Sequence, residues 1–275
     1  MILQDVMLIL IALCYVVSAC GYALNFYQKG VFQRRLGRWG LWGGWVLHTG
    51  LIVGVSLQSG NVPLTLQMLP TVCGWLVVFV YLYLEFSTRD ESLGALIVPI
   101  VVILHFLSLI ELIGTTEWVP VTYRAGWFRL HVLTYVLAYA AFAISCVSSI
   151  MYIMLLGEIQ AKHLGFFYNR LPSLEVLNQI NNRAATFGFI FLMGGMVAST
   201  VWAYQELAHP WVWGDPAFLP ILVTCVIYAG HLSFRWLAGW QGKRSAFLSI
   251  AGFTLVIFAF PVVGVLFSGQ HPLGQ

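Results

Sequence analysis

Histidine is the residue type in this chain best suited to bind a metal ion or to carry a proton near neutral pH, and the chain has seven histidines. His131 lies at the start of one long apolar stretch, and His271 lies just beyond the end of the last one. Between them in sequence is a segment that contains Trp211 and Trp213. If both stretches are helices that end on the same side of a membrane, the two histidines can converge there.

This combination of residue types suits haem, a flat apolar macrocycle whose iron takes axial ligands such as histidine nitrogen. Aromatic rings can pack against its face, and cations pair with its propionates. We therefore expect His131 and His271 to be the axial ligands, with the two tryptophans as a platform. Arg124 and Arg129 are the expected propionate contacts. The alternative is that the tryptophans form an interfacial aromatic belt and that Arg129 extends its charge to the membrane surface.

Three more histidines, His48, His105 and His231, lie inside apolar stretches. An ionisable side chain inside a membrane span is costly, so each is a functional hypothesis. His48 and His231 form a possible inner site. The alternative is a neutral histidine that is hydrogen-bonded to its surroundings, and Tyr228 and Arg235 share a helical face with His231. For His105 we expect a hydrogen bond to a neighbouring helix.

The composition excludes a water-soluble fold. The chain of 275 residues is 60% hydrophobic and 8% charged, whereas soluble domains carry about 25% charged residues. A soluble protein of this size would have a mostly apolar surface. The five cysteines form no CxxC pair, and no basic stripe suggests nucleic-acid binding.

Eight apolar stretches are long enough to cross a bilayer as helices. Their approximate bounds are 6–28, 41–57, 68–85, 93–113, 130–156, 184–204, 218–236 and 246–267. The first stretch lacks a small-residue cleavage site and is expected to be retained. The sequence thus predicts an all-α integral membrane protein, a single bundle of about eight transmembrane helices in one domain (1–275).

The cationic residues predict the orientation of these helices. Eleven of the thirteen Lys and Arg residues fall in alternate connections, and the other connections hold Arg124 and Arg129. By the positive-inside rule, the basic set faces the cytoplasm and both termini are non-cytoplasmic. The longest cytoplasmic loop is 157–183, with a helix start expected at Ser173, and the Trp-rich loop 205–217 is outer. The expected location is the cytoplasmic (inner) cell membrane, multi-pass.

Several short motifs occur in a characteristic order along nearly the whole chain. They are Trp127-Phe-Arg-Leu-His-Val132, Leu171-Pro-Ser-Leu-Glu-Val-Leu177, Phe187-Gly-Phe189, Trp202-Ala203, Trp211 to Pro216, Tyr228 to Arg235, Gly239-Trp-Gln-Gly-Lys-Arg244, Gly252-Phe253 and Ser268-Gly-Gln-His271. In this order the chain resembles the cytochrome c assembly proteins of the CcsA/HemX type, as a stand-alone, diverged member nearer the HemX branch.

The resemblance implies haem, expected to be haem b, on the outer face. His131 and His271 match the family's two external ligands, and the segment from Trp211 through Asp215 matches its haem-platform loop. There are departures: Gly214 separates Trp213 from Asp215, and the family's seventh-helix histidine would fall on Ser233, two residues from His231.

Two functions follow from the resemblance. The first is a haem-binding or haem-transporting membrane protein of cytochrome c maturation, working with another membrane protein of cytochrome c assembly or of a respiratory membrane complex. The second is a HemX-type regulatory or scaffold subunit that no longer binds haem. We expect no enzymatic activity, because no nucleophile or acid–base pair is evident.

Overall fold

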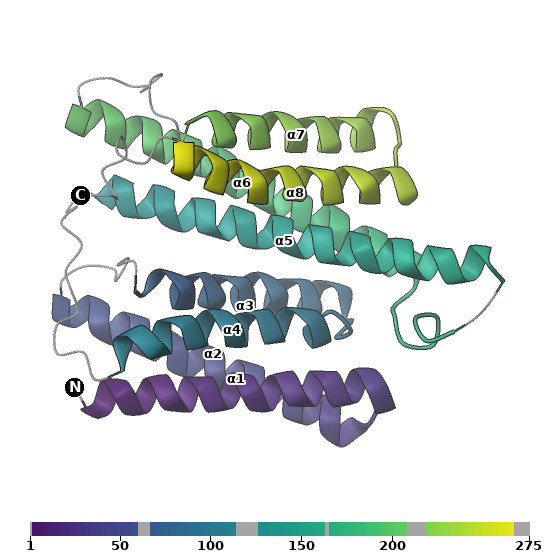
Figure 1. Cartoon of the computed structure of the whole chain (residues 1–275), viewed down its shortest axis with the longest axis horizontal. Helices are drawn as coiled ribbons and strands as arrows, with labels where there is room; N and C mark the ends of the chain where they lie inside the picture. The colour runs from purple at the N-terminus through teal and green to yellow at the C-terminus, as the bar shows by residue number, and fades with distance from the viewer. Residues whose placement is uncertain (1, 60–66, 114–125, 163–164, 208–217, 267–275) are drawn as a thin grey trace. The chain divides into compact units, whose positions relative to one another are not determined.

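The computed structural model describes residues 2–59, 67–113, 126–162, 165–207 and 218–266. Within these residues the chain is all α-helical, with eight helices and no strand (Figure 1). The helices are α1 (Ile2–Gln28), α2 (Val31–Ser59), α3 (Leu69–Thr88), α4 (Gly94–Leu112), α5 (Gly126–Gln160), α6 (Leu174–Leu207), α7 (Phe218–Leu237) and α8 (Lys243–Leu266). They fall into two compact units, residues 1–124 and residues 125–275, and each unit is described by itself.

The helices agree with the apolar stretches in the sequence. Within the described residues, seven helices (α1 to α7) are long and apolar enough to cross a membrane. The eighth, α8, spans residues 246–266 of the last stretch expected, 246–267. The all-α integral membrane fold is therefore confirmed, whereas the packing of all eight helices as one bundle and the sidedness of the termini stay predictions.

Two helices begin well before the apolar stretch that predicts them. α2 begins at Val31 rather than 41, and α6 begins at Leu174 rather than 184. In both cases the additional turns mix apolar residues with several charged or amide side chains, so a search for continuous apolar stretches excludes them although they are helical. The predicted start at Ser173 is confirmed, because its Oγ accepts a hydrogen bond from the Val176 N–H at 3.3 Å. The expected loop 157–183 accordingly contains the end of α5 and the beginning of α6.

In the first unit, α1 packs against α2 and α4, and α3 packs against α4 and α2. Glycines allow α1 and α2 to approach closely, since a Cβ atom on Gly21 would lie 2.3 Å from the Gly37 nitrogen. Ser18 Oγ donates a hydrogen bond to the Gly37 carbonyl at 2.8 Å across the same contact. Small residues at a helix contact are the usual means of close packing inside a membrane.

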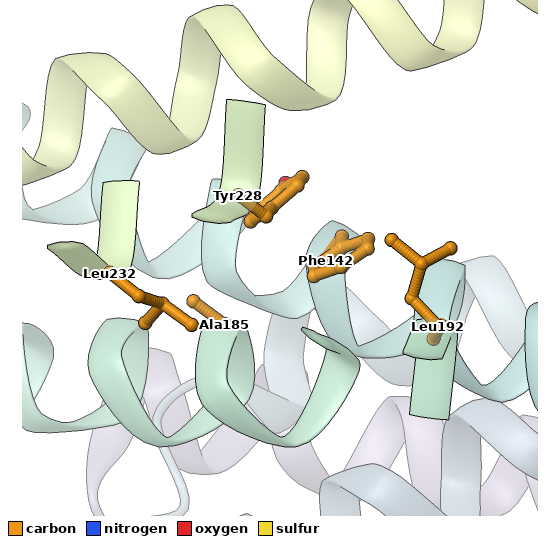
Figure 2. Packing of buried hydrophobic residues seen from close by; sticks show 6 residues of the cluster. Phe142, Ala185, Leu192, Tyr228 and Leu232 are labelled. Atoms are coloured by element: carbon orange, nitrogen blue, oxygen red, sulfur yellow. The ribbon is translucent and has the colours of Figure 1, made fainter. Parts of the chain in front are cut away.

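In the second unit, α5 and α6 pack along each other, and α8 packs against α5 and α7. The core is a cluster of fully or nearly fully buried residues: Ala138, Phe142, Ala185, Leu192, Tyr228 and Leu232 (Figure 2). Figure 2 shows the Tyr228 ring of α7 beside Phe142 of α5. The two rings are stacked, with centroids 3.5 Å apart and an interplanar angle of 12°.

A buried polar cluster also joins the helices of the second unit. The Asn181 side-chain oxygen on α6 accepts hydrogen bonds from Ser145 on α5 at 2.6 Å and from Ser249 on α8 at 2.7 Å. Its amide donates to Ser245 at 3.2 Å. Because each polar atom here has a partner, the cluster fixes the rotation of three helices at little desolvation cost.

Candidate functional site

His131 lies in the second turn of α5, which begins at Gly126. Phe128 precedes it by three residues and Tyr135 follows it by four, so all three side chains share one face of the helix. Trp202, near the far end of α6, approaches the same face. The site is thus built by one end of α5 and one end of α6, within a single unit.

Three aromatic rings frame the half-buried imidazole of His131. The Phe128 ring lies edge-on to it at a centroid distance of 4.9 Å. The Tyr135 and Trp202 rings both lie 5.7 Å away, and the Trp202 ring is tilted by 33°. The Tyr135 hydroxyl is held by Ser199 of α6 at 3.3 Å. His131 therefore sits in an aromatic setting that two helices support.

Gly195 on α6 leaves room for the Tyr135 ring. A Cβ atom at Gly195 would lie 2.6 Å from two carbons of the Tyr135 ring and 2.9 Å from Thr134 Oγ1. A Cβ atom at the neighbouring Gly194 would meet nothing within 4 Å. The close contact of α6 with the His131 face therefore requires a glycine at 195 but not at 194.

Of the other residues predicted for the outer site, Arg129 is described and lies half-buried in the first turns of α5. The remaining ones lie outside the described residues: Arg124, Trp211, Trp213, Asp215 and His271. The pairing of His131 with His271 and the tryptophan platform accordingly stay predictions.

His231 on α7 is buried and has no hydrogen-bond partner in the part of the chain that the structure describes. It is 2% exposed, and within the described residues neither its Nδ1 nor its Nε2 has a partner. The Tyr228 hydroxyl, one turn earlier, is also buried without a partner there. An unsatisfied buried polar group costs about 1–3 kcal/mol, so an imidazole of this kind is suited to an additional ligand.

Arg235, the other residue on this helical face, does not satisfy His231. Its Nη1 donates to Asn178 Oδ1 at 3.0 Å and to Ser245 Oγ at 3.3 Å. The alternative that Tyr228 or Arg235 forms a hydrogen bond with the His231 ring is therefore wrong for the described residues.

In the first unit, by contrast, His48 and His105 belong to a continuous chain of hydrogen bonds. Tyr15 Oη lies 3.1 Å from His48 Nδ1, and Thr71 Oγ1 lies 2.9 Å from His48 Nε2. The same Thr71 oxygen lies 2.7 Å from His105 Nδ1, and His105 Nε2 lies 3.0 Å from the Leu8 carbonyl oxygen. The four side chains are fully or almost fully buried and come from α1, α2, α3 and α4.

The direction of every bond in this chain follows from its last acceptor. The Leu8 carbonyl can accept but not donate, so a neutral His105 donates from Nε2 and accepts at Nδ1 from the Thr71 hydroxyl. Thr71 then accepts from His48 Nε2–H, and His48 Nδ1 accepts from the Tyr15 hydroxyl. All partners are satisfied with both histidines neutral, and the expected bond from His105 to a neighbouring helix is confirmed.

Comparison with known proteins identifies the family. Residues 65–271 match the family described as Cytochrome C assembly protein, which is well over half of the chain. The chain belongs to the cytochrome c assembly protein family. His105, His131 and His231 lie within the matched residues, while His48 precedes them.

Named relatives of the family cover most of the chain. The chain is 29% identical over 233 residues to the cytochrome c biogenesis protein CcsA of Heterosigma akashiwo, covering 72% of each protein. It is 29% identical to CcsA of Guillardia theta, covering 82% of this chain and 81% of the relative. It is 26% identical to CcsA of Prochlorococcus marinus, covering 79% and 77%. No solved structure matches the chain.

The described part of the site fits the haem that the sequence resemblance implies. His131 offers an imidazole at a helix end, and three surrounding rings provide the apolar setting that a macrocycle requires. His48 fits less well, because hydrogen bonds occupy both of its ring nitrogens. The inner pairing of His48 with His231 stays a prediction, in which His48 would have to give up one of these bonds.

Sequence reasoning missed three side chains around the histidines. Phe128 could have been found, since the spacing from 128 to 131 to 135 marks one helical face. Trp202 was noted as a motif, but its contact with His131 depends on how α6 packs on α5. Thr71 gave no signal, because a threonine in an apolar stretch is common and its role depends on two other helices.

Proposed function

We propose that this chain is a haem-handling membrane protein of cytochrome c maturation. The family and its CcsA relatives support a role in cytochrome c maturation. The observation that carries the haem assignment is the aromatic frame around His131, which α5 and α6 build together. The chain is a multi-pass membrane protein, and we place it in the cytoplasmic membrane.

In this proposal the residues of the outer face hold the group rather than transform it. His131 and His271 supply axial nitrogens, while Trp211, Trp213 and Asp215 form the platform loop. Arg124 and Arg129 pair with the propionates. When bound, haem b supplies the iron and the vinyl groups that are delivered to an apocytochrome. Because delivery needs an acceptor, a second membrane protein of the assembly process is the expected partner, and the chain itself acts as a carrier and not as an enzyme.

The test is a visible absorption spectrum of the protein purified in mild detergent, with and without added haemin. We expect a low-spin Soret band in the wild type. In His131→Ala we expect the affinity for haemin to fall on the order of tenfold. His163→Ala is the matched control, because this histidine lies in the expected cytoplasmic loop outside the proposed site.

Absence of a Soret band under all conditions would contradict the haem assignment. The better function would then be a regulatory or scaffold subunit that has lost the cofactor. The glycine inserted at 214 and the serine at 233 favour that second function.

A further inference from the structure

A second candidate site lies in the first unit, where the start of α2 meets the end of α3. A pocket of about 590 Å³ is lined there by Arg34, Arg38 and Arg89, by the carboxylate of Glu85, and by Trp42 and Phe86 among others. An adjoining depression of about 330 Å³ shares Arg34 and Arg38 and adds Arg35 and Trp39. Four arginines therefore line two adjoining depressions, and two of them, Arg34 and Arg38, line both.

Two carboxylates neutralise part of this charge. Arg34 Nε lies 3.0 Å from Glu91 Oε1, and Arg38 Nε lies 3.1 Å from Glu85 Oε1. Arg38 also pairs with Glu91. Glu85 lines the pocket, is 6% exposed, and accepts a further hydrogen bond from the Tyr22 hydroxyl at 2.7 Å. These pairs fix Arg34 and Arg38 in position.

The other two arginines keep their full charge at the surface. Arg35 and Arg89 are exposed, and within the described residues neither forms an ion pair. Four arginines against Glu85 and Glu91 leave two net positive charges at the two depressions. Burial raises the pKa of the Glu91 carboxyl, while the nearby Arg38 and Arg34 oppose this shift.

The start of α2 adds to the positive potential. Three arginines occupy its first two turns, and its first turn has no acidic residue. This arrangement is electrostatically unfavourable, because the amino end of a helix already carries a partial positive charge. A bound anion would relieve the repulsion.

The rim of the two depressions is apolar. Trp39 is 72% exposed and Phe86 is 87% exposed, and both stand beside the arginines. Exposed tryptophan next to arginine is typical of the level of lipid headgroups. The basic connections 29–38 and 89 are also expected on the cytoplasmic side, where anionic lipids are concentrated.

We propose that these two adjoining depressions bind the headgroups of anionic phospholipids through their phosphate groups, with the exposed Arg35 of the smaller depression and Arg89 of the larger one as the main contacts and Trp39 and Phe86 against the acyl chains. Arg34 and Arg38, which their carboxylate partners hold in place, complete the lining of the site. Basic pockets between membrane helices on the cytoplasmic side commonly hold such headgroups. Nothing in this assignment depends on haem.

The experiment is native mass spectrometry of the detergent-purified protein with phosphatidylglycerol or phosphatidylcholine. We expect the wild type to retain phosphatidylglycerol preferentially. Arg35→Gln with Arg89→Gln should weaken this binding on the order of tenfold or more. Both residues are exposed and unpaired, so the variant is expected to fold normally.

The matched control is Lys243→Gln with Arg244→Gln, which removes two exposed cations from another basic connection. It should leave phosphatidylglycerol binding unchanged. Equal lipid retention in the two double variants would overturn the proposal. Displacement of the lipid by millimolar inorganic phosphate or glycerol 3-phosphate would overturn the lipid as source and assign the site to a soluble phosphate.

Discussion

The two units differ in the hydrogen bonding of their buried histidines. In residues 1–124, His48 and His105 use every ring nitrogen in one chain of hydrogen bonds through Thr71. In residues 125–275, His231 is equally buried but has no partner within the described residues. Burial alone therefore does not indicate a ligand site. A histidine with all its hydrogen bonds made is structural, and one without them is suited to bind something.

This difference has a physical basis in the helices. The chain around Thr71 joins four helices, and each member is satisfied when both histidines are neutral. Such a network orders the packing of its unit and gains nothing from a ligand. At His231 a cationic residue on the same helical face, Arg235, is bound to Asn178 and Ser245 instead.

The largest effect is expected from Thr71→Val, which keeps the shape but removes the hydroxyl that both histidines share. Two buried ring nitrogens lose their partner, so we expect a loss of about 1–3 kcal/mol in stability. Thermal unfolding of the purified protein measures it as a midpoint several degrees lower.

Thr88→Val is its control on the same helix. The Thr88 hydroxyl bonds the Leu84 carbonyl of its own helix at 2.7 Å, so its removal should change the midpoint little. Equal midpoints for the two variants would show that the Thr71 chain does not stabilise the first unit.

A smaller effect is expected from His48→Phe, measured against His231→Phe. The first substitution leaves the Tyr15 hydroxyl without its acceptor and should cost about 1–2 kcal/mol. The second replaces an imidazole for which the described ranges offer no partner, so without added ligand it should cost nothing or stabilise slightly. Unfolding midpoints in the same detergent compare the two.

A larger loss of stability in His231→Phe than in His48→Phe would contradict this difference between the two units. That result would mean that His231 has a structural partner and that its unit resembles the first one after all.

The smallest stability effect concerns the neighbouring glycines of α6. At Gly195, alanine must displace Tyr135, and we expect a net loss of about 1 kcal/mol together with weaker haemin binding. At Gly194, alanine meets nothing and should stabilise the helix by about 0.5–1 kcal/mol. Unfolding midpoints and haemin titrations of both variants separate packing at the His131 face from a general effect on α6. We expect the two substitutions to change the unfolding midpoint in opposite directions. A change in the same direction for both would contradict the close contact at Gly195.

The fold could be predicted from the sequence because a bilayer imposes long apolar helices, and all eight stretches became helices. The capping residue Ser173 could also be identified. The early starts of α2 and α6 could not be found from hydropathy, since charged and amide side chains interrupt the apolar residues of these turns. Helical spacing places Phe128 and Tyr135 beside His131, but the contacts of Thr71 and Trp202 depend on the rotation of other helices, which one sequence does not reveal.

The most direct test of the account is rescue of His131→Gly by free imidazole. The wild type with stoichiometric haemin should give a low-spin spectrum, and the glycine variant should lose it. Addition of millimolar imidazole should restore the low-spin Soret band, because the ligand then enters the space that Phe128, Tyr135 and Trp202 frame. A variant whose spectrum equals that of the wild type before imidazole is added would contradict the assignment of His131 as a haem ligand.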